Sequence, residues 1–164
     1  MKDKEVLIAE NILGNISKAP GVLYKKIDDF KLQIEKIDGA LTHKAGEEQS
    51  KGLKEVAPLK HKFEGGMYTR EMFMPKGAFI VSMIHRTQHP SFLLKGEVSY
   101  ITDEGEVKRL KAPTTVFTQK GTQRVFYVHK DSIWTCVYKT NATNVKDAEL
   151  DIYANNYKEL EIKK

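Results

Sequence analysis

The sequence predicts a mainly β protein, a sandwich or small barrel of short strands, with a helical arm before it and a short helix after it. Two observations carry this prediction. From about residue 63 to 140, short runs rich in aromatic and β-branched residues alternate with turn clusters such as Pro75-Lys76-Gly77 and Asp103-Glu104-Gly105. In the flanking segments, 1–62 and 141–164, apolar residues instead recur at helical spacing.

Residues 1–62 are predicted to form the helical arm and a linker. A first helix over 4–17 shows one broad apolar face, and Ala19-Pro20-Gly21 breaks the chain after it. In a second helix the apolar residues alternate at four- and three-residue steps, which defines a heptad seam of Leu23, Ile27, Phe30, Ile34, Ile37 and Leu41. A narrow seam must be buried, either on the protein's own body or against another subunit, and the sequence leaves both open. The polar segment that follows is read as a linker with at most one helical turn.

The strands of the β domain, residues 63–140, are expected near 68–74, 78–85, 91–95, 97–102, 106–110, 114–117, 123–129 and 132–139. Asp103-Glu104-Gly105 lies between two such runs and predicts a hairpin. In residues 141–164, acidic residues come first and Leu150, Tyr153, Tyr157 and Leu160 follow at three- and four-residue steps, which predicts a C-terminal helix.

Composition excludes several classes of protein. With 40% hydrophobic and 30% charged residues, the chain is neither a membrane span nor disordered. The single cysteine, Cys136, excludes a disulfide framework and a cluster of thiolate ligands, and we expect it to be a small buried hydrophobe. The amino end has no secretory signal, so we do not expect a secreted protein. The net charge of +5 is spread along the chain, so neither nucleic acid nor a membrane is expected as a partner.

Residues 75–129 carry a pattern that resembles the cupin, or RmlC-like jelly-roll, superfamily. Gly77 and Gly96 stand where the first motif of that family opens and closes, and Gly121 stands in the second motif. The resemblance implies a double-stranded β-helix barrel with metal ligands on its inner face. Those ligand positions fall on Met83, His85, His89 and Arg124, so His85 keeps a family ligand, His89 replaces a glutamate and Arg124 replaces a histidine.

A closer likeness is to small cupin proteins encoded in tailed bacteriophage genomes. It rests on strings such as Gly66-Met67-Tyr68-Thr69-Arg70-Glu71 and Gly121-Thr122-Gln123-Arg124-Val125. In that group the two histidines and the arginine recur, but no activity is assigned. The resemblance implies a non-catalytic protein that acts through self-assembly, as an accessory or virion-associated phage component. It would lie in the cytoplasm of a bacterial host or in the virion, with itself, through the heptad seam, and other virion proteins as partners.

His85, His89 and Arg124 are the candidate site residues. Alternate residues of a strand share a face, so the two histidines should both look into the barrel, where Arg124 joins them from a neighbouring strand. Two imidazoles can share a divalent Fe, Mn, Ni or Zn ion, as in a metal-dependent isomerase or dioxygenase, but a guanidinium cannot supply a third ligand. Glu71 and Tyr127 are candidates for that place.

Two other readings of these residues stay open. Arg124 can bind a carboxylate or phosphate with two hydrogen bonds, and the imidazoles would add donors, which makes a small anionic-ligand binder. Alternatively, the cluster is satisfied internally and binds nothing. No catalytic residue is assigned, and no cofactor is expected apart from the possible divalent metal. The remaining histidines, His43, His61 and His129, stand in polar contexts and are expected at the surface.

Overall fold

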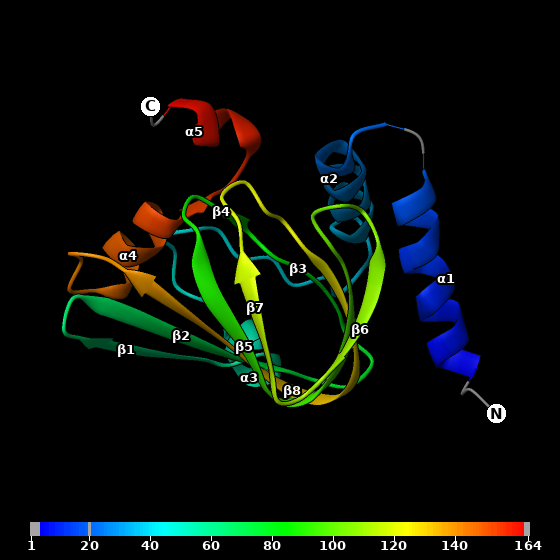
Figure 1. Ribbon diagram of the computed structural model, residues 1–164, viewed down its shortest axis with the longest axis horizontal. Coiled ribbons are helices and arrows are strands. Elements are labelled where there is room, and N and C mark those ends of the chain that lie inside the picture. The colour runs from blue at the N-terminus through cyan, green and yellow to red at the C-terminus, as the bar shows by residue number, and fades with distance from the viewer. Residues whose placement is uncertain (1–3, 20, 163–164) are drawn as a thin grey trace.

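The computed structural model describes residues 4–19 and 21–162, so Pro20 of the predicted chain break lies outside it (Figure 1). Its strands are β1 (Leu59–Glu64), β2 (Met67–Met74), β3 (Phe79–Val81), β4 (Ile84–His85), β5 (His89–Ile101), β6 (Val107–Lys111), β7 (Thr114–Thr118), β8 (Val125–Lys139) and β9 (Tyr153–Ala154). Its helices are α1 (Lys4–Lys18), α2 (Leu23–Ile34), α3 (Lys51–Val56), α4 (Val145–Ile152) and α5 (Tyr157–Ile162). None of these helices is both long and apolar enough to cross a membrane.

Two long bent strands, β5 and β8, build the barrel. The antiparallel order is β1-β2-β8-β5-β6, and β3 and β7 are added to β8 and β5. The first half of β8 pairs with β3 and its second half with β2, while β5 pairs first with β7 and then with β6. Because both strands pass from one layer to the other, the sheet folds over on itself. This confirms the predicted mainly β fold, a barrel with an N-terminal helical arm before it and short helical structure after it.

The bends in β5 and β8 differ from the sequence prediction, which split each of them into two strands. Lys95-Gly96 and His129-Lys130-Asp131 were read as turns, but the pairing of β5 with β8 continues across irregularities at these points. Gly96 has φ +89°, and a Cβ there would lie 2.5 Å from Asp131 O. Only glycine therefore lets the two strands cross so closely.

Three other segments also differ from the prediction. Strand β1 begins at Leu59, inside the expected linker, and the expected strand 78–85 is interrupted between β3 and β4. The C-terminal segment holds two short helices separated by β9, because Tyr153 pairs with His85 instead of continuing the helix.

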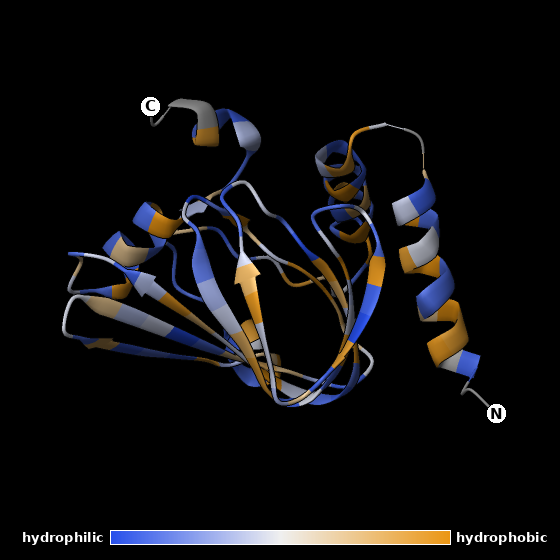
Figure 2. Cartoon of the chain, viewed as in Figure 1, coloured by the Kyte–Doolittle hydropathy of each residue, from blue (hydrophilic) through white to orange (hydrophobic). Residues whose placement is uncertain are grey.

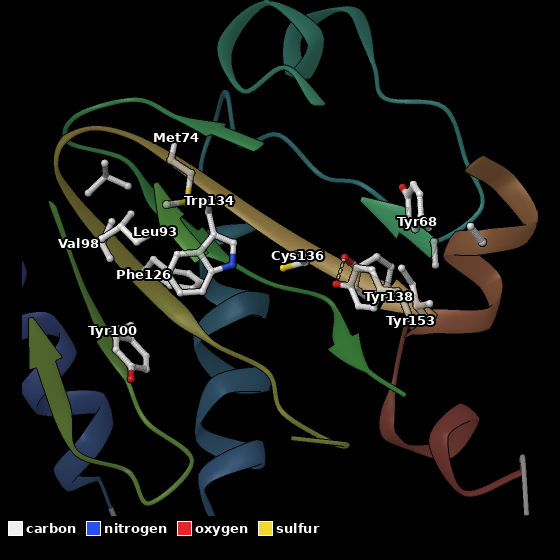
Figure 3. Packing of buried hydrophobic residues seen from close by; sticks show 14 residues of the cluster. Tyr68, Met74, Leu93, Val98, Tyr100, Phe126, Trp134, Cys136, Tyr138 and Tyr153 are labelled. Carbon is white, nitrogen blue, oxygen red and sulfur yellow. Dashed lines mark hydrogen bonds between the residues drawn. The ribbon is translucent and has the colours of Figure 1, made fainter. Parts of the chain in front are cut away.

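The barrel interior is filled by aromatic and aliphatic side chains (Figure 3). Even-numbered residues of β8, such as Phe126 and Trp134, face inward, and odd-numbered Val125 and Tyr127 face outward toward the arm. This is the two-residue alternation of a strand with both faces covered. Cys136 is buried in the interior, as the sequence suggested.

The arm helices α1 and α2 lie beside each other along one flank of the barrel (Figure 1), and each carries apolar residues among polar ones (Figure 2). Leu13 and Ile27 are fully buried against Ile101 and Val125, and each contributes about 1.5–3 kcal/mol by its burial. The first half of the heptad seam therefore packs on the protein's own barrel.

The second half of the seam does not. Helix α2 ends at Ile34, and turns follow with Gly39 at φ +83°. Ile37, within these turns, is 63% exposed, and Leu41, after them, is 45% exposed. The helix ends earlier than the heptad spacing predicted because the chain turns away after Ile34.

Candidate functional site

Strand β4 and the loop 119–123 bring the predicted site residues to one end of the barrel. The backbone N–H of Gly121 donates to His85 O at 2.7 Å, and the backbone N–H of His85 donates to Thr122 O at 3.0 Å. The ring centroids of His85 and His89 are 4.6 Å apart. Both histidines and Arg124, which precedes β8, are buried.

The two histidines are held as neutral imidazoles. His89 Nδ1 donates to Thr87 O at 3.0 Å, so its Nε2 is left as an acceptor, and no hydrogen-bond partner lies near it. His85 Nδ1 lies 3.4 Å from the hydroxyl of Tyr138. Burial lowers the pKa of His85 well below its ordinary value, and neighbouring His89 and Arg124 lower it further. Burial also lowers the pKa of His89 to about 4.

Tyrosines surround the imidazoles. The ring of Tyr138 lies 4.1 Å from that of His89, and its hydroxyl is 2.8 Å from the hydroxyl of Tyr153 (Figure 3). Burial raises the pKa of Tyr153 to about 12 and that of Tyr138 well above its ordinary value. These groups are therefore uncharged at neutral pH and form a stacked, hydrogen-bonded cluster.

Arg124 is held by groups of the same chain. Its Nη1 donates to Thr118 Oγ1 at 2.8 Å, its Nη2 lies 3.8 Å from Asp103 Oδ2, and its guanidinium lies 5.4 Å from the centre of the Tyr100 ring. Its Nε is buried without a hydrogen-bond partner. The arginine thus already has an acid beside it and an aromatic ring below it.

These residues do not fit the metal site that the family resemblance implies. The other candidates for a third ligand lie elsewhere: Glu71 pairs with Lys60 at 3.2 Å, and Tyr127 packs beneath the arm. In the described part of the chain, no three His, Cys, Asp or Glu side chains are grouped to hold an ion. A cationic guanidinium beside two imidazoles would repel a metal rather than bind it.

A second polar cluster, which the sequence did not reveal, closes the barrel near α4. Glu149 is 1% exposed and accepts hydrogen bonds from the backbone N–H of Gly46 at 3.1 Å and from His43 Nε2 at 3.2 Å. Arg70 Nε lies 3.6 Å from its other oxygen. Burial opposes ionisation of Glu149, but His43, Arg70 and Gly46 outweigh it and lower its pKa. In the sequence, Glu149 is indistinguishable from an exposed helical acid.

Of the other three histidines, which were expected at the surface, only His61 is exposed. His129 is buried, and its Nε2 lies 2.7 Å from Ser99 Oγ, so the prediction of a surface residue was wrong for it. His43 is partly buried and contacts the carboxylate of Glu149. His61 is exposed, and its Nδ1 lies 2.7 Å from the hydroxyl of Tyr68.

No family model matches the sequence, and no curated protein matches it significantly. Solved structures resemble about half of the chain. They include the Cupin_2 domain of an XRE family transcriptional regulator from Enterobacter cloacae, which is 14% identical with a TM-score of 0.43, over 50% of this chain and 94% of that chain. KdgF from Halomonas sp. is 15% identical with a TM-score of 0.45, over 52% of this chain and 82% of that chain. Ectoine synthase from P. lautus is 9% identical with a TM-score of 0.45, over 51% of this chain and 64% of that chain. Because these TM-scores are below 0.5, the strand pairing of the chain itself carries the fold assignment.

Proposed function

We propose that this protein is a non-catalytic cupin-fold scaffold that acts through self-association. One observation carries the first half of the proposal. At the end of the barrel where the family resemblance places ligands, His85 and His89 are neutral and packed on tyrosines, and Arg124 is held by Thr118 and Asp103. Groups that are already bonded to one another favour a structural role over a reactive one.

The second half rests on an apolar patch on the outer face of the barrel, called here the outer band. Strand register places its members on the same face of neighbouring strands β2, β8, β5 and β7: Phe73, Ile133, Val137, Phe92, Leu94 and Phe117. Phe117 is 61% exposed and Leu94 52% exposed. Helices α1 and α2 cover the other flank of the barrel, around Ile101 and Val125.

A second copy of this chain is the partner that fits the outer band. Thr115 and Thr135 pair with Phe92 of the band, and Glu71 is neutralised by Lys60 at 3.2 Å. One exposed cation, Lys95, pairs with Ile133 at the edge of the band. Two such bands can meet if the flexible Lys95 side chains keep their ammonium groups hydrated at the rim, although the whole chain has a net charge of +5. Face-to-face packing of two copies about a two-fold axis is the commonest way for such a patch to be buried.

The setting of this assembly is suggested by the sequence alone. The resemblance to phage-encoded cupins favours an accessory or virion-associated component, with other virion proteins as further partners. The three similar structures named above are not phage proteins. The exposed end of the heptad seam, Ile37 and Leu41, offers a second surface for such contacts.

Light scattering after size exclusion tests the proposal. The protein should elute at a multiple of its chain mass, and Phe117→Asp should reduce that mass, because a carboxylate cannot be buried unpaired between two bands. Leu32→Asp is the matched control, since Leu32 is 55% exposed but lies outside both the outer band and the heptad seam. Ile27 is unsuitable as a test position because it is buried within the chain itself. Equal masses for the wild type and Phe117→Asp would contradict the outer band as the interface.

The small anionic-ligand binder remains a second candidate because a buried donor, Arg124 Nε, lacks a hydrogen-bond partner. His89 Nε2 also has no hydrogen bond, but as an acceptor it can only bind a protonated oxygen of the ligand, such as the hydroxyl of hydrogen phosphate. A thermal-shift titration with acetate and phosphate tests this candidate, since a ligand of the native state raises its melting temperature. A rise that is lost in Arg124→Gln would favour it. No rise at millimolar anion would leave these two atoms to a buried water.

A further inference from the structure

A cleft of about 290 Å³ lies at the mouth of the barrel, outside the buried cluster and away from the outer band. One wall is the face of α2 with Leu23, Tyr24 and Ile27, and the opposite wall is the loop 119–123. Asp103 and Tyr157, at the start of α5, complete the lining. Its size suits a small organic molecule.

Two polar side chains of this cleft, Asp103 and Gln123, supply acceptors. Asp103 Oδ1 accepts a hydrogen bond from Thr122 Oγ1 at 2.8 Å, and its side chain is 34% exposed, so its remaining lone pairs are accessible. Gln123 is 4% exposed. Its Nε2 donates to Ser82 O at 3.1 Å, which fixes the amide, and its Oε1 has no hydrogen-bond partner. A buried amide oxygen without a donor is unfavourable, so a ligand that supplies an N–H is favoured here.

Two aromatic rings stand over the same cleft. The ring centroids of Tyr24 and Tyr157 are 4.6 Å apart, and the hydroxyl of Tyr157 donates to Gly121 O at 3.2 Å. This bond ties the C-terminal segment to the loop 119–123. Burial raises the pKa of Tyr157 to about 12, and the nearby negative charges of Asp28 and Asp103 add to the rise. The ring faces and the two carboxylates make the surroundings favourable for a positive charge.

We propose that the cleft binds a small organic cation, a primary ammonium group on a short alkyl chain. The ammonium lies between Asp103 and Gln123 Oε1, and the alkyl chain lies against Leu23, Ile27 and a tyrosine ring. An ammonium group has three N–H donors and no acceptor, which matches the acceptors of the cleft. A neutral alcohol of the same length would lack the attraction to Asp103, and a carboxylate would be repelled by it.

Two cations lie near the proposed position. Lys120 is exposed at the rim, so its ammonium stays hydrated and can swing away. Arg124 Nη2 lies 3.8 Å from Asp103 Oδ2, on the interior side of the carboxylate, while the other oxygen is bonded to Thr122. A carboxylate has about four acceptor positions, so both contacts leave room for an ammonium group.

Titration of the purified protein with n-butylammonium, followed by NMR or calorimetry, tests the proposal, and n-butanol and butyrate are the matched probes. We expect saturable binding of the amine and at least tenfold weaker binding of the other two. Asp103→Asn should weaken amine binding roughly tenfold or more, because a charge-assisted hydrogen bond is lost while the amide oxygen still accepts from Thr122. Gln123→Met should weaken it by a similar factor.

Two exposed positions keep the test valid if a buried variant folds poorly. Tyr24→Leu removes one ring from the surface and should weaken amine binding several-fold, because the cation–π contribution is lost. Lys120→Met should leave the affinity unchanged or raise it, since a nearby positive charge is removed. Binding of butyrate or butanol as tight as that of the amine, an unchanged affinity in folded Asp103→Asn, or no saturable amine binding would each overturn the proposal. None of these outcomes bears on self-association, which is measured by mass.

Discussion

The buried imidazole of His89 makes a quantitative prediction about stability at acidic pH. Its pKa is about 4 in the folded chain, compared with an ordinary value of 6.5. Below pH 6.5 the unfolded chain therefore binds a proton that the folded chain does not bind until about pH 4. Stability that is present above pH 6.5 is lost as the pH falls through this range. At about 1.36 kcal/mol per pH unit, the difference amounts to a loss of about 3 kcal/mol.

Replacing His89 by Gln removes this titration and isolates its magnitude. Urea unfolding at several pH values between 7 and 4 can be followed by the fluorescence of Trp134, the single tryptophan, which is buried. We expect the free energy of unfolding of His89→Gln to fall by about 3 kcal/mol less than that of the wild type over this range. Gln88→Ala, at an exposed neighbouring position, should follow the wild type. Parallel curves for His89→Gln and the wild type would refute the reasoning that the neutral imidazole is enforced by burial.

Two further substitutions test the packing that holds the site. Gly96→Ala should lower the free energy of unfolding by about 3 kcal/mol or more, because the new Cβ would lie 2.7 Å from Ser132 Cα and the residue has a positive φ. A loss below about 1 kcal/mol would show that the two strands can separate freely. Glu149→Gln should cost about 3 kcal/mol at pH 7, because Arg70 loses the acid beside it, and the cost should shrink as the pH falls below the ordinary carboxyl value of 4.5. A loss of stability that does not depend on pH would contradict a charged pair of Glu149 and Arg70. Urea unfolding measures the stability of both variants.

The fold was largely predictable because strand alternation and turn residues are local signals. Runs of β-branched and aromatic residues located most strands, and the heptad spacing located α2 up to Ile34. The breaks were less predictable, because Gly96 and Asp131 are turn residues in isolation but bend continuous strands here. Whether a glycine ends a strand or lets it cross another strand depends on a tertiary contact, which cannot be identified from the sequence.

The residues of the candidate site could be named from the sequence, but their protonation and their hydrogen-bond partners could not. Strand alternation and the cupin resemblance predicted that His85, His89 and Arg124 face into the barrel, and all three are buried. Their neutrality and pairing depend on Tyr138 and Thr118, which are distant in sequence. The same holds for Glu149, whose partners come from the linker and from β2. Long-range partners decide whether a polar residue is reactive, bonded or exposed, and periodicity carries no information about them.

The mass of the untagged protein in solution, measured by light scattering at tens of micromolar, tests the central claim most directly. Self-association through the outer band predicts a multiple of the chain mass of 18.7 kDa that falls toward the single-chain value in Phe117→Asp. A wild-type mass of 18.7 kDa across that concentration range would contradict the proposal that this barrel acts by assembling with itself.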